Sequence, residues 1–321
     1  MFATLNRPEA PPDRSAPTAA PTEQKPVAVM NAQTEPLPDN LPATATGERI
    51  YTIGDIHGRF DLLQELLEQI SRYDTTLKKA KSTSLVILGD MIDRGPDSAR
   101  TLDYLYHLAR RRKVTVLLGN HEDVLLRAIG GETGVMSAWM RFGGRETLQS
   151  YGVTPPEKDE EHLNAARQLA EAIPPHILAW LRSLPVSARS GDYFFCHAGI
   201  KPGLAPNRQQ REDLLWIRRE FLESNRDYGV VVVHGHSIAP DVEVRHNRIG
   251  IDTGAYRTGN LTALYLEGTE CGVLSTGETA RPSAAPEEAW AAPSPAQPET
   301  ARPETAGTET VAAEAAPTAK S

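Results

Sequence analysis

The chain has 321 residues and a formal net charge of −8, from 34 basic and 42 acidic side chains. An acidic chain without a basic block is not expected to bind nucleic acid, and its two cysteines are too few for a disulfide scaffold. No apolar run is long enough to span a membrane, and the prolines and charges that begin at Arg7 leave no apolar core for a signal peptide, so we expect a cytoplasmic protein.

Both ends of the chain are rich in proline, alanine, threonine and glutamate. Residues 1–48 and 275–321 share this composition and have almost no apolar periodicity. Such segments bury too little apolar surface to offset the entropy lost on ordering, so we predict that both are disordered tails. The remaining residues, 49–274, match the size of one α/β catalytic domain.

Apolar runs alternate with helical patterns in the first half of this domain. Three runs indicate buried strands, at residues 50–53, 85–88 and 114–118. The apolar positions from Phe60 to Ile70 predict a helix after the first strand. Gly95-Pro96 is expected to open a second helix, which ends at the arginines of residues 110–112. This βαβαβ order predicts a sheet that begins with parallel strands.

Residues 130–185 differ from this pattern. They contain two glycine pairs, a charged stretch and a helical pattern over Leu163–Ala172, which together indicate a mostly helical excursion near the site. Four further apolar runs then predict strands, at residues 193–196, 230–233, 249–251 and 261–266. The order of these strands in a sheet does not follow from the local pattern.

Five short polar motifs each follow one of these apolar runs directly. They are Gly54–Gly58, Gly89–Gly95, Gly119–Glu122, His197–Gly199 and His234–His236. Open α/β sheets bind ligands beyond the carboxyl ends of their strands, so we expect the five motifs to meet at one edge of a sheet. One such motif alone is weak evidence for a binding site, whereas five motifs in this order are a specific signal.

The residue types in these motifs are suited to binding two metal ions. Asp55 and His57 are two residues apart, which at a strand end places both side chains on one face, where they can bind one metal together. Asp90 can bridge two metals through its two oxygens. Three later side chains would complete the second site: Asn120, His197 and His236. Imidazole, carboxylate and amide ligands without a thiolate favour manganese, iron or zinc in a catalytic pair.

Two more features of the motifs point to a phosphate substrate. Asn120 and His121 are adjacent and should point apart, so that one binds metal while the other faces the substrate. Two divalent ions, two carboxylates and one bridging hydroxide carry a net charge of about +1, before Arg94 and Arg218 are added. This positive charge suits a phosphate monoester dianion.

The motifs resemble those of the phosphoprotein phosphatase (PPP-type) family of metallophosphoesterases in its bacterial form. The resemblance covers about residues 49–270 and includes Asp213–Arg218 and Ile251–Gly254. It implies an α/β/β/α fold, in which a β-sandwich is flanked by helices. It also implies two divalent metal ions, manganese in the first place and iron or zinc as alternatives, that share a hydroxide which attacks phosphorus in line.

The resemblance also implies a role for each motif residue. One metal would be held by Asp55, His57 and Asp90. The other would be held by Asp90, Asn120, His197 and His236. His121, oriented by Asp93, would protonate the leaving alkoxide. Arg94 and Arg218 would bind the phosphate oxygens.

The predicted function is hydrolysis of phosphoserine and phosphothreonine monoesters in phosphoproteins or phosphopeptides, accompanied by some activity on phosphotyrosine or small esters. A hydrolase of dinucleoside polyphosphates is the alternative, because it shares the fold and most of the metal motifs. Such enzymes usually carry Gly-Asn-His-Asp and lack the Asp of Asp-Arg-Gly, so Glu122 and Asp93 favour the phosphatase. An inactive phosphoprotein-binding scaffold is a further alternative, although no expected ligand or acid is missing.

Several other residues have two interpretations. His234 either hydrogen-bonds behind the site or ends a strand, and we expect the structural role. Cys196 is expected to be a buried strand residue, because no arginine follows it at the spacing that cysteine-dependent phosphatases need. Four residues either line the substrate site or pack the excursion onto the sheet: Trp139, Met140, Phe142 and Tyr151. The Pro-x-x-Pro segments Pro8–Pro11 and Pro295–Pro298 are candidate partner-docking sites in the tails.

Overall fold

The computed structural model describes residues 41–277. Most of both predicted tails, including the two Pro-x-x-Pro segments, therefore lies outside the described residues, and the predicted disorder stays a prediction. Within residues 41–277, no helix combines the length and the apolar character that crossing a membrane requires.

Two five-stranded sheets organise the described residues. The first sheet has the spatial order β10 (Glu270–Ser275), β9 (Thr262–Glu267), β1 (Glu48–Ile53), β2 (Ser82–Ile87) and β3 (Val114–Val116). The second sheet has the order β4 (Ser187–Ser190), β5 (Tyr193–Cys196), β6 (Val231–His234), β8 (Arg248–Gly250) and β7 (Glu243–Arg245). Strands β1, β2 and β3 are parallel, as the βαβαβ pattern predicted, and so are β5, β6 and β8.

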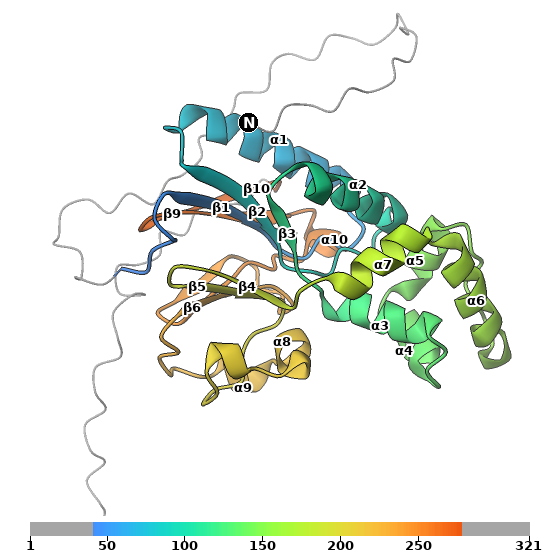
Figure 1. Cartoon of the computed structure of the whole chain (residues 1–321). Helices are drawn as coiled ribbons and strands as arrows, with labels where there is room; N and C mark the ends of the chain where they lie inside the picture. The colour runs from blue at the N-terminus through green and yellow to red at the C-terminus, as the bar shows by residue number, and fades with distance from the viewer. Residues whose placement is uncertain (1–40, 278–321) are drawn as a thin grey trace, which may run out of the picture. The chain divides into compact units, whose positions relative to one another are not determined.

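Both faces of the central strands are buried, because the two sheets pack face to face and helices cover their outer faces (Figure 1). Side chains alternate between the layers along each strand. In β2, Leu85 and Ile87 face the helices, whereas Val86 faces the second sheet. In β5, Phe195 faces the first sheet and Phe194 faces outward. The apolar runs are therefore strands buried on both sides, and the expected α/β/β/α arrangement is confirmed.

The helices surround this sandwich (Figure 1). Two long helices cover the outer face of the first sheet: α1 (Phe60–Thr76) and α2 (Ser98–Arg111). Two short helices cover the outer face of the second sheet: α8 (Arg211–Trp216) and α9 (Arg219–Leu222). Helix α3 (Asn120–Ile129) follows β3, and four more helices form the excursion predicted over residues 130–185: α4 (Val135–Arg141), α5 (Gly144–Ser150), α6 (His162–Ala172) and α7 (Pro175–Ser183). The connections contain α10 (Ala255–Thr258) and the 3₁₀ turns η1 (Asp159–Glu161) and η2 (Pro206–Arg208).

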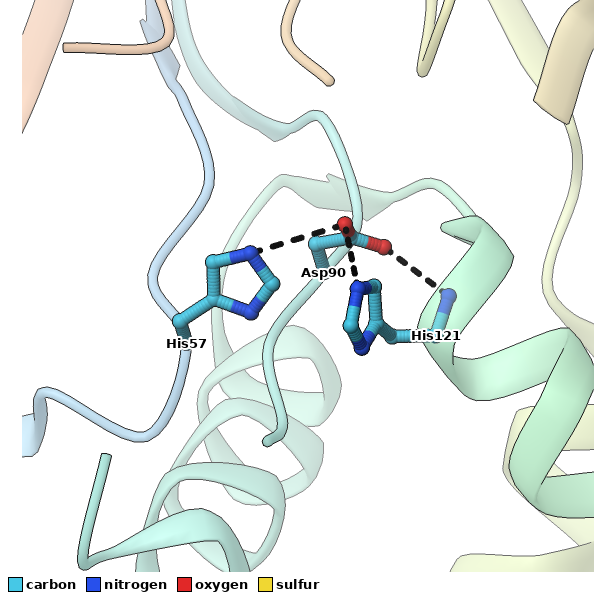
Figure 2. Close-up of side chains that lie close together, drawn as sticks. All are labelled: His57, Asp90 and His121. Atoms are coloured by element: carbon cyan, nitrogen blue, oxygen red, sulfur yellow. Dashed lines mark hydrogen bonds and ion pairs between the residues drawn. The ribbon is translucent and has the colours of Figure 1, made fainter. Parts of the chain in front are cut away.

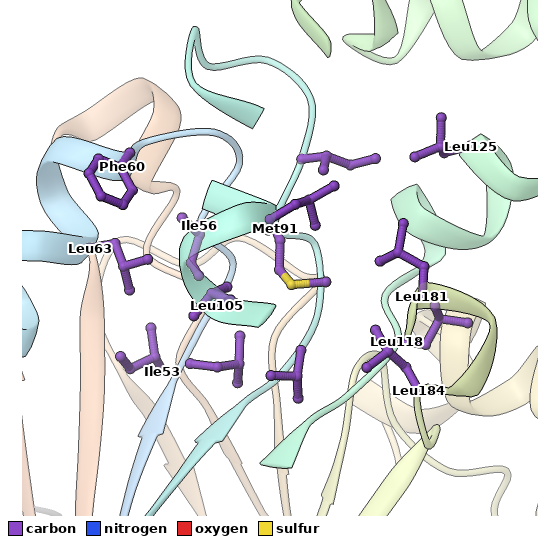
Figure 3. Close-up of a cluster of buried hydrophobic side chains, with 14 of the residues drawn as sticks. Ile53, Ile56, Phe60, Leu63, Met91, Leu105, Leu118, Leu125, Leu181 and Leu184 are labelled. Atoms are coloured by element: carbon purple, nitrogen blue, oxygen red, sulfur yellow. The ribbon is translucent and has the colours of Figure 1, made fainter. Parts of the chain in front are cut away.

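One core cluster joins the helices to the first sheet. It contains Ile53 from β1, Leu105 from α2 and Leu181 from α7, all of them fully buried (Figure 3). Burying one such side chain contributes about 1.5–3 kcal/mol relative to leaving it exposed. This cluster therefore holds the excursion against the edge of the sheet at which the motifs lie.

Three strands have no apolar run and were not expected from the sequence: β4, β7 and β10. Each is an edge strand, so it pairs on one side only. The residues of β4 read Ser-Ala-Arg-Ser and those of β7 read Glu-Val-Arg. Hydrogen bonding to the neighbouring strands β5 and β8, rather than burial of their own side chains, makes these segments strands.

One predicted boundary is wrong in detail. The second helix begins at Ser98 instead of Gly95-Pro96, because the N–H of Gly95 donates to the carbonyl of Asp93 and holds a turn there. After β3, residues 120–122 of the third motif begin helix α3.

The folded unit is longer at both ends than the predicted 49–274. Thr44 is buried, and its N–H donates to the Gly268 carbonyl at 3.0 Å. The N–H of Asp192 donates to the Ala43 carbonyl at 2.9 Å, so this segment joins the first sheet to the second. At the other end, β10 continues to Ser275.

Candidate metal centre

The five motifs lie at the carboxyl ends of five strands, β1, β2 and β3 in one sheet and β5 and β6 in the other. Hydrogen bonds join them across the sheets: His197 Nδ1 lies 2.9 Å from the Leu88 carbonyl oxygen, and the His236 N–H lies 3.0 Å from an Asp55 oxygen. The buried site residues are Asp55, His57, Asp90, Asp93, Asn120, His121, His197 and His236. Arg94 is half-buried and Arg218 is exposed. The motifs therefore meet, but where the strand ends of two sheets come together rather than at one edge of a single sheet as predicted.

The motif loops have an unusual backbone conformation. Within residues 41–277, the residues other than glycine with a positive φ all belong to the site: His57, Asp90, Asp93, Arg94 and His236. Each such conformation costs about 1–3 kcal/mol. Hydrogen bonds between the loops offset this cost, since the N–H groups of Ile56 and His57 both donate to the carbonyl of Asp90.

Glu122 holds the second and third motifs together. Its fully buried carboxylate accepts hydrogen bonds of 2.7–3.2 Å from the backbone N–H groups of Asp90, Met91, Ile92 and Gly119. Burial raises the pKa of this carboxyl, whereas the four donors favour its ionised form. The sequence suggested Glu122 only as a marker of substrate class. A glutamate three residues after the N-cap of a helix is a capping-box pattern, which could have indicated this role.

One group of possible metal ligands consists of His57, Asp90 and His121 (Figure 2). The Nε2 atoms of His57 and His121 lie 3.7 and 3.8 Å from Oδ2 of Asp90. Nδ1 of His57 lies 2.8 Å from the Ile92 carbonyl oxygen, to which it must donate, so the lone pair of the neutral ring is on Nε2 and faces Asp90. Burial lowers the pKa of His57 to about 3, which keeps the ring in this neutral form that binds metals.

A second group consists of Asp90, His197 and His236. Nδ1 of His197 donates to the Leu88 carbonyl, which leaves a lone pair on Nε2. That atom lies 2.7 Å from Oδ1 of Asn120, 3.1 Å from Nδ1 of His236 and 3.4 Å from Oδ1 of Asp90. Burial lowers the pKa of both histidines, so each ring is neutral and carries one proton. The proton of His197 is on Nδ1, so Nδ1 of His236 is the only one of these four atoms that can carry a proton.

The second group also contains a polar atom without a partner. Nε2 of His236 is buried and has no hydrogen-bond partner within residues 41–277. The acceptor atoms of the second group lie close together, and there are too few protons between them for each to accept a hydrogen bond. A bound divalent cation would provide these atoms and the unpartnered imidazole nitrogen with a common partner. The donor set of imidazole, carboxylate and amide oxygen therefore fits a metal ion of the expected kind.

Asp55 lies beside these groups rather than within them. Both of its oxygens accept the N–H of His236, at 3.0 and 3.2 Å. Burial, together with the charges of Asp252 and Asp90, raises the pKa of Asp55 well above its ordinary value. Such crowding of buried carboxylates also fits a nearby cation. The first group contains His57 without Asp55, so the joint binding of one metal that their spacing suggested stays a prediction.

His121 and Asn120 point to different groups, as their adjacency predicted. Asn120 faces His197, whereas Nδ1 of His121 donates to Oδ2 of Asp93 at 2.6 Å. Burial by itself would lower the pKa of His121, but the charge of Asp90 and the hydrogen bond with Asp93 raise it above its ordinary value. His121 is therefore well suited to carry a proton.

Two residues outside the motifs contact Asp93: Trp139, for which the sequence left both the substrate site and packing open, and Thr147, which it did not single out. Nε1 of Trp139 donates to Oδ2 at 2.7 Å, and Oγ1 of Thr147 donates to Oδ1 at 2.5 Å. The Asp93 side chain is completely buried by its surroundings. No local pattern indicates these contacts, because they join residues that are 46 and 54 positions apart in the chain.

A pocket opens in front of the two groups. The Arg94 guanidinium lies 2.9 Å from Nε2 of His57 and 3.1 Å from Nε2 of His121. Arg218 and two exposed aromatic side chains, Phe142 and Trp216, also line the pocket. The two arginines make the mouth of the pocket positive, which suits an anionic substrate.

The structure distinguishes the two interpretations of several residues. Met140 and Tyr151 pack against the core, whereas Phe142 lines the pocket. His234 is buried behind the site, where its ring packs on an aromatic side chain of α9. Cys196 is buried, and burial raises the pKa of its thiol, so it is not a nucleophile.

Comparison with known proteins places this site in context. The family model described as Metallophos, calcineurin-like phosphoesterase, matches residues 48–263. A solved structure described as a "putative diadenosine tetraphosphatase" superimposes with a TM-score of 0.51 at 22% identity, over 74% of this chain and 99% of that chain. At this identity the likeness concerns the fold alone.

Two relatives of similar identity carry different names. The symmetrical bis(5'-nucleosyl)-tetraphosphatase of Vibrio cholerae serotype O1 is 29% identical over 193 residues, which are 60% of this chain and 58% of that enzyme. Serine/threonine-protein phosphatase 2 of Escherichia coli (strain K12) is 30% identical over 226 residues, which are 66% of this chain and 90% of that protein. The chain thus spans less than two thirds of the first relative and most of the second.

We expect that replacing His197 with alanine weakens Mn²⁺ binding by at least about tenfold, because the substitution removes one of the acceptor atoms of the second group. Calorimetric titration of the metal-free protein with Mn²⁺ measures the change. His176→Ala is the matched control, since His176 is exposed on α7 and belongs to neither group. Equal Mn²⁺ affinity in the two variants would show that the second group holds no metal.

Replacing Glu122 with glutamine is expected to lower the free energy of unfolding by about 1–3 kcal/mol, because the amide nitrogen would face backbone N–H donors. Urea denaturation of the metal-free protein measures this loss. Glu68→Gln, on the exposed side of α1, is the control. A loss no larger than that of the control would contradict the role of Glu122 in joining the two motifs.

Proposed function

Because the chain belongs to the calcineurin-like phosphoesterase family, we propose that it is a metal-dependent phosphatase that hydrolyses phosphoserine and phosphothreonine monoesters in proteins. Members of this family are hydrolases that use divalent metal ions. The choice of substrate is the part of the proposal that goes beyond the family.

The pair of His121 and Asp93 is the observation that carries this choice. A serine or threonine phosphate releases an alkoxide, which is strongly basic and must receive a proton as the P–O bond breaks. A dinucleoside polyphosphate releases a phosphate anion of much lower basicity, which has less need of a proton. A histidine that has a raised pKa, lines the pocket and is bonded to a buried carboxylate supports the first reaction.

Manganese is the proposed metal, with iron or zinc as alternatives, because the donor set contains no thiolate. We propose one ion at Asp55, His57 and Asp90, and a second ion at Asp90, Asn120, His197 and His236. When bound, such ions activate water as Lewis acids and neutralise the charge of the phosphate.

The side chains around the pocket supply binding and proton transfer. Arg94 and Arg218 are proposed to bind phosphate oxygens, since both line the pocket and a guanidinium can donate two parallel hydrogen bonds. His121 is proposed to donate the proton on Nε2 to the leaving oxygen, while Nδ1 stays bonded to Asp93. The carboxylate thus keeps the ring in one orientation during the transfer.

Hydrolysis of diadenosine tetraphosphate is the second candidate, and the names of the relatives support it as well as they support the first. The exposed rings of Phe142 and Trp216 favour it, since aromatic side chains stack on nucleotide bases. The same rings can contact a peptide side chain, so they do not separate the candidates. The His121–Asp93 pair supports the first candidate.

We also propose a cytoplasmic location and phosphoproteins or phosphopeptides as substrates. The two cysteines, Cys196 and Cys271, are free and buried. Unpaired thiols are usual where the surroundings keep them reduced, which supports this location.

Turnover in the presence of Mn²⁺ tests the proposal directly, with a phosphoserine/phosphothreonine peptide and diadenosine tetraphosphate as competing substrates. We expect the wild type to prefer the peptide, and Asp93→Asn to lower kcat on the peptide by about 100-fold or more. Hydrolysis of p-nitrophenyl phosphate should fall much less, because its leaving group is weakly basic.

Asp103→Asn, on the exposed side of α2, is the control for the charge change. A wild-type preference for diadenosine tetraphosphate would favour the second candidate. An equal loss on the peptide and on p-nitrophenyl phosphate would mean that Asp93 supports the whole site rather than the acid.

The pH dependence of kcat/KM on the peptide should report the protonation of His121. The ring must be protonated to act and its pKa lies above the ordinary 6.5, so activity should persist through that pH and be lost as pH rises through the raised pKa. Asp93→Asn removes one interaction that raises this pKa, so the alkaline limb should move to lower pH. A limb that stays in place would contradict the assignment of the acid.

A further inference from the structure

The helical excursion reaches the proposed acid through Asp93. Trp139 on α4 and Thr147 on α5 donate to the two oxygens of the Asp93 carboxylate, at 2.7 and 2.5 Å. We propose that Trp139 and Thr147 are positioning residues, which fix the Asp93 carboxylate so that it orients His121 toward the leaving group. This inference rests on the proposed function, in which His121 is the acid.

The Asp93 carboxylate depends on these donors. Oδ2 receives the N–H groups of Trp139 and His121, and Oδ1 receives the hydroxyl of Thr147. Asp93 is completely buried, and a buried carboxylate is stable in its ionised form only when donors surround it. Removing either donor of the excursion leaves the carboxylate with fewer partners and free to rotate away from His121.

The backbone of Asp93 also needs support. Its φ of 73° lies in the left-handed region, which is uncommon for residues other than glycine and persists where the surroundings hold it. The N–H of Asp93 donates to Oγ of Ser98 and to Oγ1 of Thr147, both at 3.0 Å. Thr147 therefore bonds both the backbone and the carboxylate of Asp93, and it couples the backbone angle to the direction of the side chain.

Trp139 is itself held in one orientation. It is fully buried, and Gly144 packs directly on its ring. A Cβ atom on Gly144 would lie 2.4 Å from Cδ2 of Trp139, so only glycine allows this contact. The direction of the indole N–H toward Asp93 is therefore set by the junction of α4 and α5.

The same junction contacts the next site residue, Arg94. The Arg94 N–H donates to the Gly143 carbonyl at 3.0 Å, and Nε donates to the Phe142 carbonyl at 3.3 Å. Residues 139–147, here called the Trp139–Thr147 segment, thus support both Asp93 and Arg94. One short segment of the excursion holds the partner of the acid and a phosphate-binding arginine together.

The consequence for catalysis follows from leaving-group chemistry. His121 matters most for leaving groups that are basic enough to need a proton. Neither Trp139 nor Thr147 belongs to the metal-ligand groups, so their loss should leave those groups in place. The loss of activity should therefore be concentrated on substrates such as phosphoserine.

The test uses the full chain loaded with Mn²⁺ and two variants that remove the donor, Trp139→Phe, which has a smaller ring, and Thr147→Val, which keeps the side-chain shape. We expect kcat on a phosphoserine peptide to fall by about tenfold in each, as for the loss of one hydrogen bond, with KM nearly unchanged. Turnover of p-nitrophenyl phosphate should fall by less than about twofold. Trp180→Phe on α7 and Thr101→Val on α2 are the matched controls, since Trp180 packs against the core and Oγ1 of the buried Thr101 has no hydrogen-bond partner within residues 41–277.

A double-mutant comparison separates positioning from general damage to the fold. If Trp139 acts through Asp93, adding Trp139→Phe to Asp93→Asn should not lower kcat on the peptide any further. A further loss on that background would overturn the inference. So would an equal loss on the peptide and on p-nitrophenyl phosphate in the single variants, or an unchanged peptide turnover in both of them.

Failure of the proposed function has a different signature. A wild-type protein that cleaves diadenosine tetraphosphate but not the phosphopeptide would reject the proposed substrate class. The positioning role is then decided on small monoesters in the same variants. A larger loss on β-glycerol phosphate, which releases an alkoxide, than on p-nitrophenyl phosphate supports it, and an equal loss overturns it.

Discussion

The carboxylate of Asp90 lies between the two groups of histidines, and each of its oxygens faces one group. Oδ2 lies 3.7 Å from His57 and 3.8 Å from His121, whereas Oδ1 lies 3.4 Å from His197. One side chain can reach both groups only where the strands of two sheets end at the same place. Packing the sheets face to face creates that place, so the β-sandwich and the site depend on each other.

Asp90 and four neighbouring site residues have a strained, left-handed backbone conformation, and interactions elsewhere in the structure offset its energetic cost. The left-handed residues of the site cost about 1–3 kcal/mol each, and they are held by hydrogen bonds between loops and by the carboxylate of Glu122. The buried core beneath α1, α2 and α7 keeps these loops in place. A site held in this way presents its polar groups before a substrate arrives, which is how preorganised groups lower a reaction barrier.

The excursion contributes to the site in two ways. The exposed ring of Phe142, directly after α4, lines the pocket, so this segment helps to form the surface that a substrate meets. The Trp139–Thr147 segment also bonds Asp93 and Arg94, so it holds groups that act on the phosphate in the proposed reaction. Substrate contact and support of the acid therefore come from one segment, and a change in one is expected to affect the other.

The sequence by itself determined the central strands, because an apolar run buried on both faces is a local signal, and it determined which polar residues follow their ends. It did not determine the edge strands: β4 and β7 are strands because a neighbour pairs with them, and β10 pairs with β9. Tertiary structure alone placed Asp90 between the two groups of histidines, because it brought the strand ends of two sheets together. It alone brought Trp139 and Thr147 to Asp93, because residues 46 and 54 positions apart meet only after the excursion has packed on the sheet.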